Sequence, residues 1–314
     1  MKNLFIFLVA TLFLVGCKSD NKEQKSYSDR LDELKSKRDF YLEQTVTTQD
    51  QDGWIEAKKC DALLHNALYS VGGGTDYQNL FKARDDSGQW FRRPAADCLS
   101  SGGSKSTISR DMLLGLMIAI LANRDLEAID ALVKYGEDND FKMGENDGSL
   151  DGKNRVRATP SFQSLMYQVR ANLGGQPNDK QKIPQDFTPF KKGFERHLAG
   201  LTILLRGLMR GGIDQIEQNT IRDYVKDDPN NALFWAIRNT FQEDDQAEAI
   251  GILLRQDLFP VDRLPTSSDR CNAYLWMHGE KPSDWDPCDK GETHPAHDFL
   301  FATWVIERNS VRID

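Results

Sequence analysis

The stretch MLLGLMIAILA, residues 112–122, is the most apolar run of the chain outside residues 1–17. After a break at Asn123-Arg124-Asp125, the stretch LEAIDALVKY at 126–135 places apolar residues on one side and charged residues on the other. A helix that is apolar all round must be covered on every side, whereas an amphipathic helix keeps one side in water. The sequence therefore predicts a hairpin of one inner and one outer helix.

The same pattern returns twice further along the chain. An apolar run at 197–209 precedes an amphipathic run at 213–225, and a weaker pair occupies 231–241 and 247–254. No run of alternating apolar and polar residues is long enough to predict a strand. We therefore predict an all-α fold. Further helices are expected after the cap Ser28-Asp29, at 54–69, at 162–173 and at 299–306. The glycines Gly72-Gly73-Gly74 are expected to end the helix at 54–69.

This series of inner and outer helices is similar to the α/α toroids that house many polysaccharide lyases and glycosidases. In those folds the inner helices converge on a central cleft, which the resemblance implies here as well. The resemblance is architectural, because no catalytic motif of such a family is matched, and a fold alone does not transfer a function. An irregular array of helical hairpins with long loops is the alternative.

The N-terminus has the layout of a signal peptide, with Lys2 followed by an apolar run from Leu4 to Val15. The residues Leu14-Val15-Gly16-Cys17 resemble the lipobox of bacterial lipoproteins. This resemblance implies cleavage before Cys17, acylation of that cysteine with fatty acids such as palmitate, and anchoring to a membrane of the cell envelope. Lys18 follows the cysteine where many inner-membrane lipoproteins carry aspartate, which favours the outer membrane.

Three segments follow from this layout: the signal peptide at 1–17, a polar tether with one amphipathic helix at 18–52, and a single all-α domain at 53–314. The chain carries 40 Lys and Arg against 48 Asp and Glu, a formal net charge of -8 at pH 7. Nucleic acid and anionic headgroups are therefore unsuitable partners for the surface as a whole.

Four cysteines remain besides Cys17. An even number in an oxidising compartment predicts two disulfides. Three pairings are open, and we favour Cys60 with Cys98 and Cys271 with Cys288, because each pair flanks a loop-rich stretch. Neither spacing resembles the CxxC pattern of zinc or redox sites, and we expect no metal and no cofactor.

Ser109-Arg110-Asp111 opens the apolar helix at 112–122. At the mouth of a cleft, Arg110 and Asp111 would bind a carboxylate or a sugar hydroxyl, and the helix N-terminus would add a positive field. The alternative is structural, with Ser109 or Thr107 as the cap and Arg110 paired to a neighbouring acid.

The loop Trp90-Phe91-Arg92-Arg93-Pro94 combines flat apolar rings with two guanidinium groups. Aromatic rings stack on sugars and arginines bind carboxylates or phosphates, so Trp90, Arg92 and Arg93 would suit an acidic glycan. The alternative is a loop plug in which the aromatic rings are buried and the arginines pair with surface acids.

Two histidine groups are candidates for acid-base chemistry. His294, His297 and Asp298 lie close together near the C-terminus, and His65 follows Asp61 by one helical turn. We expect His297 or His65 as the base, with Asp298 or Asp61 as the orienting carboxylate and His294 among the ligand-binding groups. In the structural alternative Asp298 caps a helix and His297 packs in the core.

Two functions are consistent with the sequence. In the first, an envelope lipoprotein binds, and in an enzymatic version cleaves, an extended glycan in a polar cleft. In the second, a non-enzymatic lipoprotein presents its helical body to another envelope protein. No P-loop, GxGxxG or GxSxG motif is present, so nucleotide-dependent chemistry and serine-esterase chemistry are not expected.

Overall fold

The computed structural model describes residues 25–55, 62–94, 108–144, 157–177, 193–242, 244–269, 291 and 293–310. This part of the chain is all-α, as predicted, and contains isolated β-bridges but no strand. None of its helices is both long and apolar enough to cross a membrane. The elements are α1 (Tyr27–Thr45), η1 (Val46–Thr48), α2 (Ala62–Val71), η3 (Tyr77–Ala83), α3 (Arg110–Asn123), α4 (Leu126–Asp138), α5 (Pro160–Asn172), α6 (Gly193–Arg210), α7 (Gln215–Asp227), α8 (Ala232–Gln242), α9 (Ala247–Leu253) and α11 (His297–Ser310).

The first predicted hairpin is confirmed as α3 and α4. Every residue of α3 from Met112 to Leu121 is buried, so this helix is covered on all sides. Arg124 ends α3 in the left-handed conformation with φ 55°, and the Asp125 side chain then caps α4 by accepting from the backbone N–H of Ala128. Helix α4 buries only one face, which makes it the outer partner.

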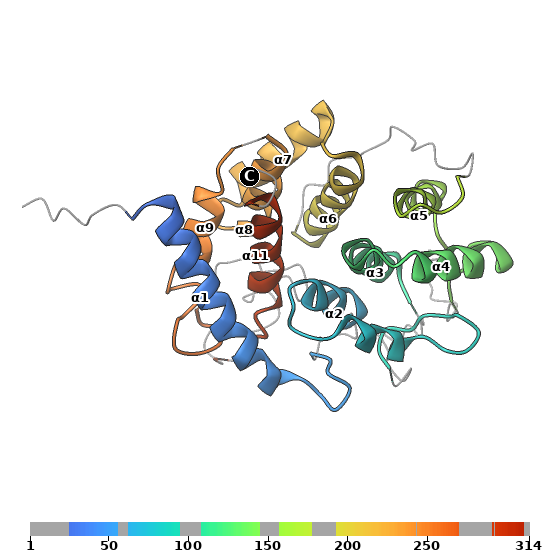
Figure 1. Cartoon of the computed structure of the whole chain (residues 1–314), viewed down its shortest axis with the longest axis horizontal. Helices are drawn as coiled ribbons and strands as arrows, with labels where there is room; N and C mark the ends of the chain where they lie inside the picture. The colour runs from blue at the N-terminus through green and yellow to red at the C-terminus, as the bar shows by residue number, and fades with distance from the viewer. Residues whose placement is uncertain are drawn as a thin grey trace, which may run out of the picture.

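The two later hairpins are confirmed as α6 with α7 and α8 with α9. The contacts between helices continue beyond these pairs. Helix α2 contacts α3, α3 contacts α5 and α6, α6 contacts α8, α8 contacts α11, and α11 contacts α2 again. Figure 1 shows α11 between α1 and α9 on one side and α2 and α6 on the other. The series of helix-to-helix contacts that begins at α2 therefore ends at α2.

Trp54 and Ile55, which the sequence placed in a helix at 54–69, are not helical. The side chain of Asn66 accepts from the backbone N–H of Ile55 at 2.8 Å and donates to the Ile55 carbonyl at 3.0 Å. These bonds hold Trp54 and Ile55 in an extended segment beside the helix. The predicted glycine stop is correct, because Gly73 follows α2 with φ +84°.

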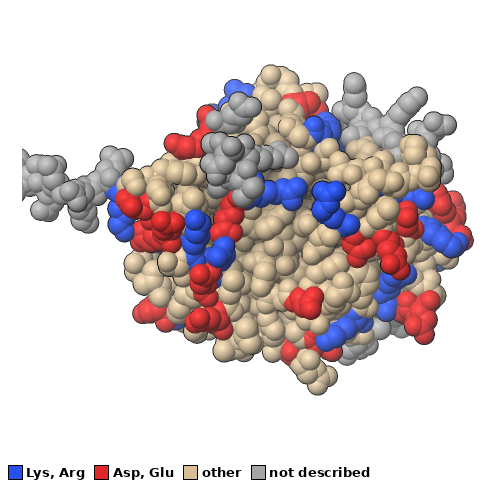
Figure 2. Space-filling model, in the orientation of Figure 1, with Lys and Arg blue, Asp and Glu red and all other residues tan. Residues whose placement is uncertain are grey.

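Helix α1 begins earlier than the Ser28-Asp29 cap suggested. Ser26 is the N-cap, and its side chain and that of Asp29 form a capping box. Helix α1 contacts α9 and α11, so it belongs to the packed body. Figure 2 shows charged residues gathered over α1 at one edge and over the α4 and α5 side at the other, with fewer charges between them.

Candidate functional site

Three buried histidines come from the starts of three helices that are far apart in the sequence. His65 lies in the first turn of α2, His197 near the start of α6, and His297 is the first residue of α11. Their exposed fractions are 0%, 0% and 2%.

The rings of His65 and His297 contact each other, with centroids 5.1 Å apart at an interplanar angle of 73°. Nδ1 of His297 lies 3.2 Å from the carbonyl oxygen of Pro295. A carbonyl oxygen only accepts, so Nδ1 carries the proton of this hydrogen bond. In the neutral imidazole the lone pair therefore resides on Nε2, and this atom is the one able to accept a proton.

His197 completes the group electrostatically. Its pKa is lowered to about 3, chiefly by burial and in smaller part by the charge of His297, while Asp298 acts in the opposite direction. The side chains of His197, His297 and Asp298 are therefore close enough to influence one another's charge. We refer to His65, His197, His297 and Asp298 as the histidine cluster.

Asp298 and His294, the other residues predicted near the C-terminus, both take part in hydrogen bonds with backbone groups. Oδ1 of Asp298 accepts from the backbone N–H of Phe299 at 2.9 Å, at the start of α11. His294 is 3% exposed, and its backbone N–H donates to the carbonyl of Pro265 at 2.9 Å. No metal-binding group of three or more His, Cys, Asp or Glu side chains is found among the described residues.

The start of α3 carries three polar side chains, Ser109, Arg110 and Asp111, for which the described part of the chain provides neither a hydrogen bond to the hydroxyl nor an ion pair. Ser109 occupies the N-cap position and is 8% exposed, but its hydroxyl makes no hydrogen bond to a described residue. Arg110 and Asp111 are half-buried, and neither forms an ion pair with any residue in the described ranges. The capping role considered for Ser109 is therefore not observed.

The Trp90 loop is packed inward. Trp90 is 2% exposed, and its ring lies 5.4 Å from that of Phe81. Arg92 is 6% exposed and Arg93 is half-buried. The burial of Trp90 matches the loop plug, because a ring with almost no exposed surface cannot stack on a sugar without moving.

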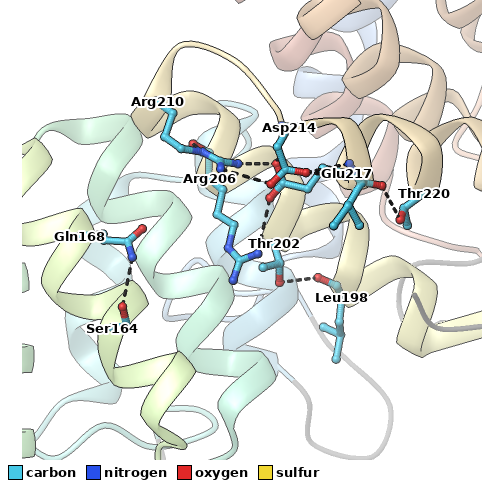
Figure 3. Close-up of polar contacts among 10 residues, drawn as sticks. Ser164, Gln168, Leu198, Thr202, Arg206, Arg210, Asp214, Glu217 and Thr220 are labelled. Atoms are coloured by element: carbon cyan, nitrogen blue, oxygen red, sulfur yellow. Dashed lines mark hydrogen bonds and ion pairs between the residues drawn. The ribbon is translucent and has the colours of Figure 1, made fainter. Parts of the chain in front are cut away.

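A second group of charged residues joins α6 to α7 (Figure 3). Glu217, whose side chain is 1% exposed, pairs with Arg210 and lies 3.5 Å from Nη1 of Arg206. Its carboxylate also accepts from the backbone N–H of Asp214 at 3.0 Å, which completes a capping box at the start of α7. We refer to Arg206, Arg210 and Glu217 as the charge lock.

The structure brings together some of the predicted site residues. The His65 ring contacts that of His297, and Asp298 follows His297 at the start of α11. Helices α2 and α3 are also in close contact, since a Cβ added at Gly115 would lie 3.0 Å from the Leu64 Cα. Several predicted residues lie outside the described residues, namely Cys17, Cys60, Asp61, Cys98, Cys271 and Cys288.

His197 was not among the residues predicted for the site. Its only sequence signal is a histidine at the start of an otherwise apolar helix, the same signal that His65 gives in α2. The comparisons with known proteins add no candidate, because no family model, no curated protein and no solved structure matches the chain.

Proposed function

We propose that this chain is a lipid-anchored protein of the cell envelope whose helical body binds an extended acidic glycan. The lipid anchor follows from the lipobox-like residues ending in Cys17, and Lys18 favours the outer membrane. If the bound glycan is also cleaved, His297 or His65 is the base. The body would be an α/α toroid, an arrangement supported by the contacts that run from α2 through α3, α6, α8 and α11 back to α2.

One observation carries the glycan proposal: the polar start of α3. A buried hydroxyl without a hydrogen bond costs about 1 to 3 kcal/mol relative to a satisfied one. Ser109 bears that cost beside Arg110 and Asp111, which have no ion-pair partner among the described residues. A bound sugar acid would satisfy all three, because its carboxylate suits Arg110 and the helix N-terminus, and its hydroxyls suit Ser109 and Asp111.

The test is the affinity of the full lipidated chain in detergent for polygalacturonate, measured by calorimetry beside dextran as an uncharged polymer. We expect binding of polygalacturonate and at least a ten-fold loss, about 1.4 kcal/mol, in Arg110→Gln. Arg222→Gln is the matched control, because it removes the same charge from the exposed face of α7.

Equal affinities of the wild type and Arg110→Gln would contradict the proposal that α3 holds the ligand. If binding is retained in Arg110→Gln and lost in His297→Gln, the ligand lies at the histidine cluster instead. The formation of new chain ends in the polymer, and its loss in His297→Gln, would identify the protein as an enzyme.

A second function is favoured by the depth of the histidine cluster. His65, His197 and His297 have almost no exposed surface, and Trp90 is also covered. An envelope protein that only contacts another protein would bury such groups to tie its helices together. This alternative predicts that neither polymer binds, and that a partner protein is retained equally by the wild type and His297→Gln.

A further inference from the structure

The N-terminal helix is fixed to the body at several levels along its length. Arg30 donates to the carbonyl of Ala247 at 2.7 Å, Lys37 to that of Leu253 at 2.8 Å, and Tyr41 to that of Pro260 at 2.6 Å. Lys37 is only 5% exposed although it carries an amine, and Tyr41 is fully buried. Helix α1 therefore cannot swing as a flexible spacer without breaking buried hydrogen bonds.

A further contact ties α1 to α11. The Tyr41 ring packs edge-on against that of Phe299, with centroids 4.6 Å apart, and Arg38 pairs with Glu307. In Figure 1 the two helices run in opposite directions, so the start of α11 lies towards the end of α1. The histidine cluster lies on this side, because His297 and Asp298 immediately precede Phe299.

Helix α1 begins with a capping box at Ser26 and Asp29. The Ser26 hydroxyl accepts from the backbone N–H of Asp29 at 3.2 Å, and the Asp29 carboxylate accepts from the backbone N–H of Ser26 at 3.1 Å. This capping box fixes the first turn of α1 immediately after Lys25.

The chain between the anchor and the helix is short. Whatever their conformation, the residues from Lys18 to Lys25 can separate Cys17 from Ser26 by at most about 30 Å. Helix α1 has 19 residues and is itself about 28 Å long. Its start is therefore confined near the anchor, whereas its end can lie twice as far away.

We propose that α1 is a rigid strut that orients the body on a lipid surface. Its Tyr27 end, together with Arg30 and the start of α9, faces the lipid, and its Val46 end faces away. This inference rests on the lipid anchor of the proposed function. It places the start of α11, and with it the buried histidine cluster, on the side of the body remote from the membrane.

Energy transfer to labelled lipid tests this orientation. Tyr27 and Val46 form a matched pair, because they stand at opposite ends of α1 and are 39% and 60% exposed. Each is replaced in turn by an azide-bearing amino acid that carries the donor, which leaves the native cysteines untouched. The full lipidated chain is bound to vesicles of phosphatidylethanolamine and phosphatidylglycerol with acceptors on the headgroups.

We expect transfer from position 27 to exceed transfer from position 46 by about two-fold, because the helix separates them by about 28 Å. A flexible Gly/Ser linker of about twelve residues inserted after Gln24 should lower the transfer from position 27. Equal or reversed transfer in a chain that is bound to the vesicles would overturn the strut while leaving the anchor intact.

The anchor is checked separately by co-sedimentation with the vesicles. The wild type should sediment with them and Cys17→Ser should remain in solution. If the wild type also remains in solution, the lipid anchor itself is wrong, and the orientation inferred from it falls with the anchor.

Discussion

Helices α3 and α7 both have a short oxygen-bearing residue at the N-cap position and an acidic residue in the first turn, but the polar groups at the two starts have different partners. At α7, Asp214 caps the helix and Glu217 joins it to Arg206 and Arg210. At α3, Ser109 occupies the cap position without capping. The first start is satisfied within the protein, whereas the second is satisfied by no described residue. Polar groups of the second kind are the better candidates for binding a ligand.

The largest effect should come from breaking the charge lock. Glu217→Gln removes the negative charge of a carboxylate that is 1% exposed and that Arg206 and Arg210 share, and we expect a loss of about 3 kcal/mol in the free energy of unfolding. Urea denaturation provides the measurement. Asp138→Asn, which removes the exposed partner of Lys134, should leave the free energy of unfolding nearly unchanged, because water and salt screen a surface ion pair. A loss below about 1 kcal/mol in Glu217→Gln would show that the lock does not stabilise the α6–α7 connection.

The histidine cluster should make stability depend on pH in a defined direction. The pKa of His197 is lowered to about 3, below that of a histidine in the unfolded chain, so the unfolded state binds the proton first as the pH falls. Stability is therefore complete above about pH 6.5 and falls by about 1.4 kcal/mol per pH unit below it. Urea curves at pH 6.5 and 5.0 should differ by about 2 kcal/mol more in the wild type than in His197→Gln. The same difference in both proteins would mean that His197 accepts its proton without cost.

The contact that positions His65 should be sensitive to one methyl group. A Cβ at Gly115 would lie 3.0 Å from both the Cα and the carbonyl oxygen of Leu64, which are backbone atoms that cannot turn aside. Gly115→Ala should cost about 1 to 2 kcal/mol in thermal unfolding, despite the better helix propensity of alanine. Gly212→Ala is the control, since nothing lies within 4 Å of a Cβ there. Equal melting temperatures would show that α2 and α3 can separate freely.

The smallest effect distinguishes the two helix starts directly. Asp214→Ala removes a working cap and should cost about 1 kcal/mol. Ser109→Ala removes a hydroxyl that makes no hydrogen bond to a described residue, so stability should be unchanged or slightly higher. A loss of 1 kcal/mol or more in Ser109→Ala would show that this hydroxyl has a partner within the protein.

The helices could be predicted from the sequence because their apolar patterns are local. The inner position of α3 followed from a run without a polar face, and the outer position of α4 from its single apolar face. The non-helical backbone at Ile55 could not be predicted, because it is bound by the side chain of Asn66. Composition and spacing do not report a contact of that kind.

In the candidate site, too, the features that are local in the sequence could be predicted and the contacts between distant segments could not. Asp298 and His297 were visible as neighbours, and Arg110 was visible at the entrance of an apolar helix. The approach of His65 to His297, and the influence of both His297 and Asp298 on His197, join residues of α2, α6 and α11 that are far apart in the sequence. Contacts between such distant segments leave no local pattern, which is why His197 was missed.

Hydrogen exchange at the starts of α3 and α7, with and without saturating polygalacturonate, tests the central claim most directly. The first backbone N–H groups of a helix have no partner within the helix, so a bound carboxylate at α3 should slow their exchange. We predict protection at residues 110–112 and no change at residues 215–217, where the Asp214 side chain already accepts from the backbone N–H groups of Ile216 and Glu217. Protection at neither start, or at α7 alone, would contradict the claim that the start of α3 is the ligand site.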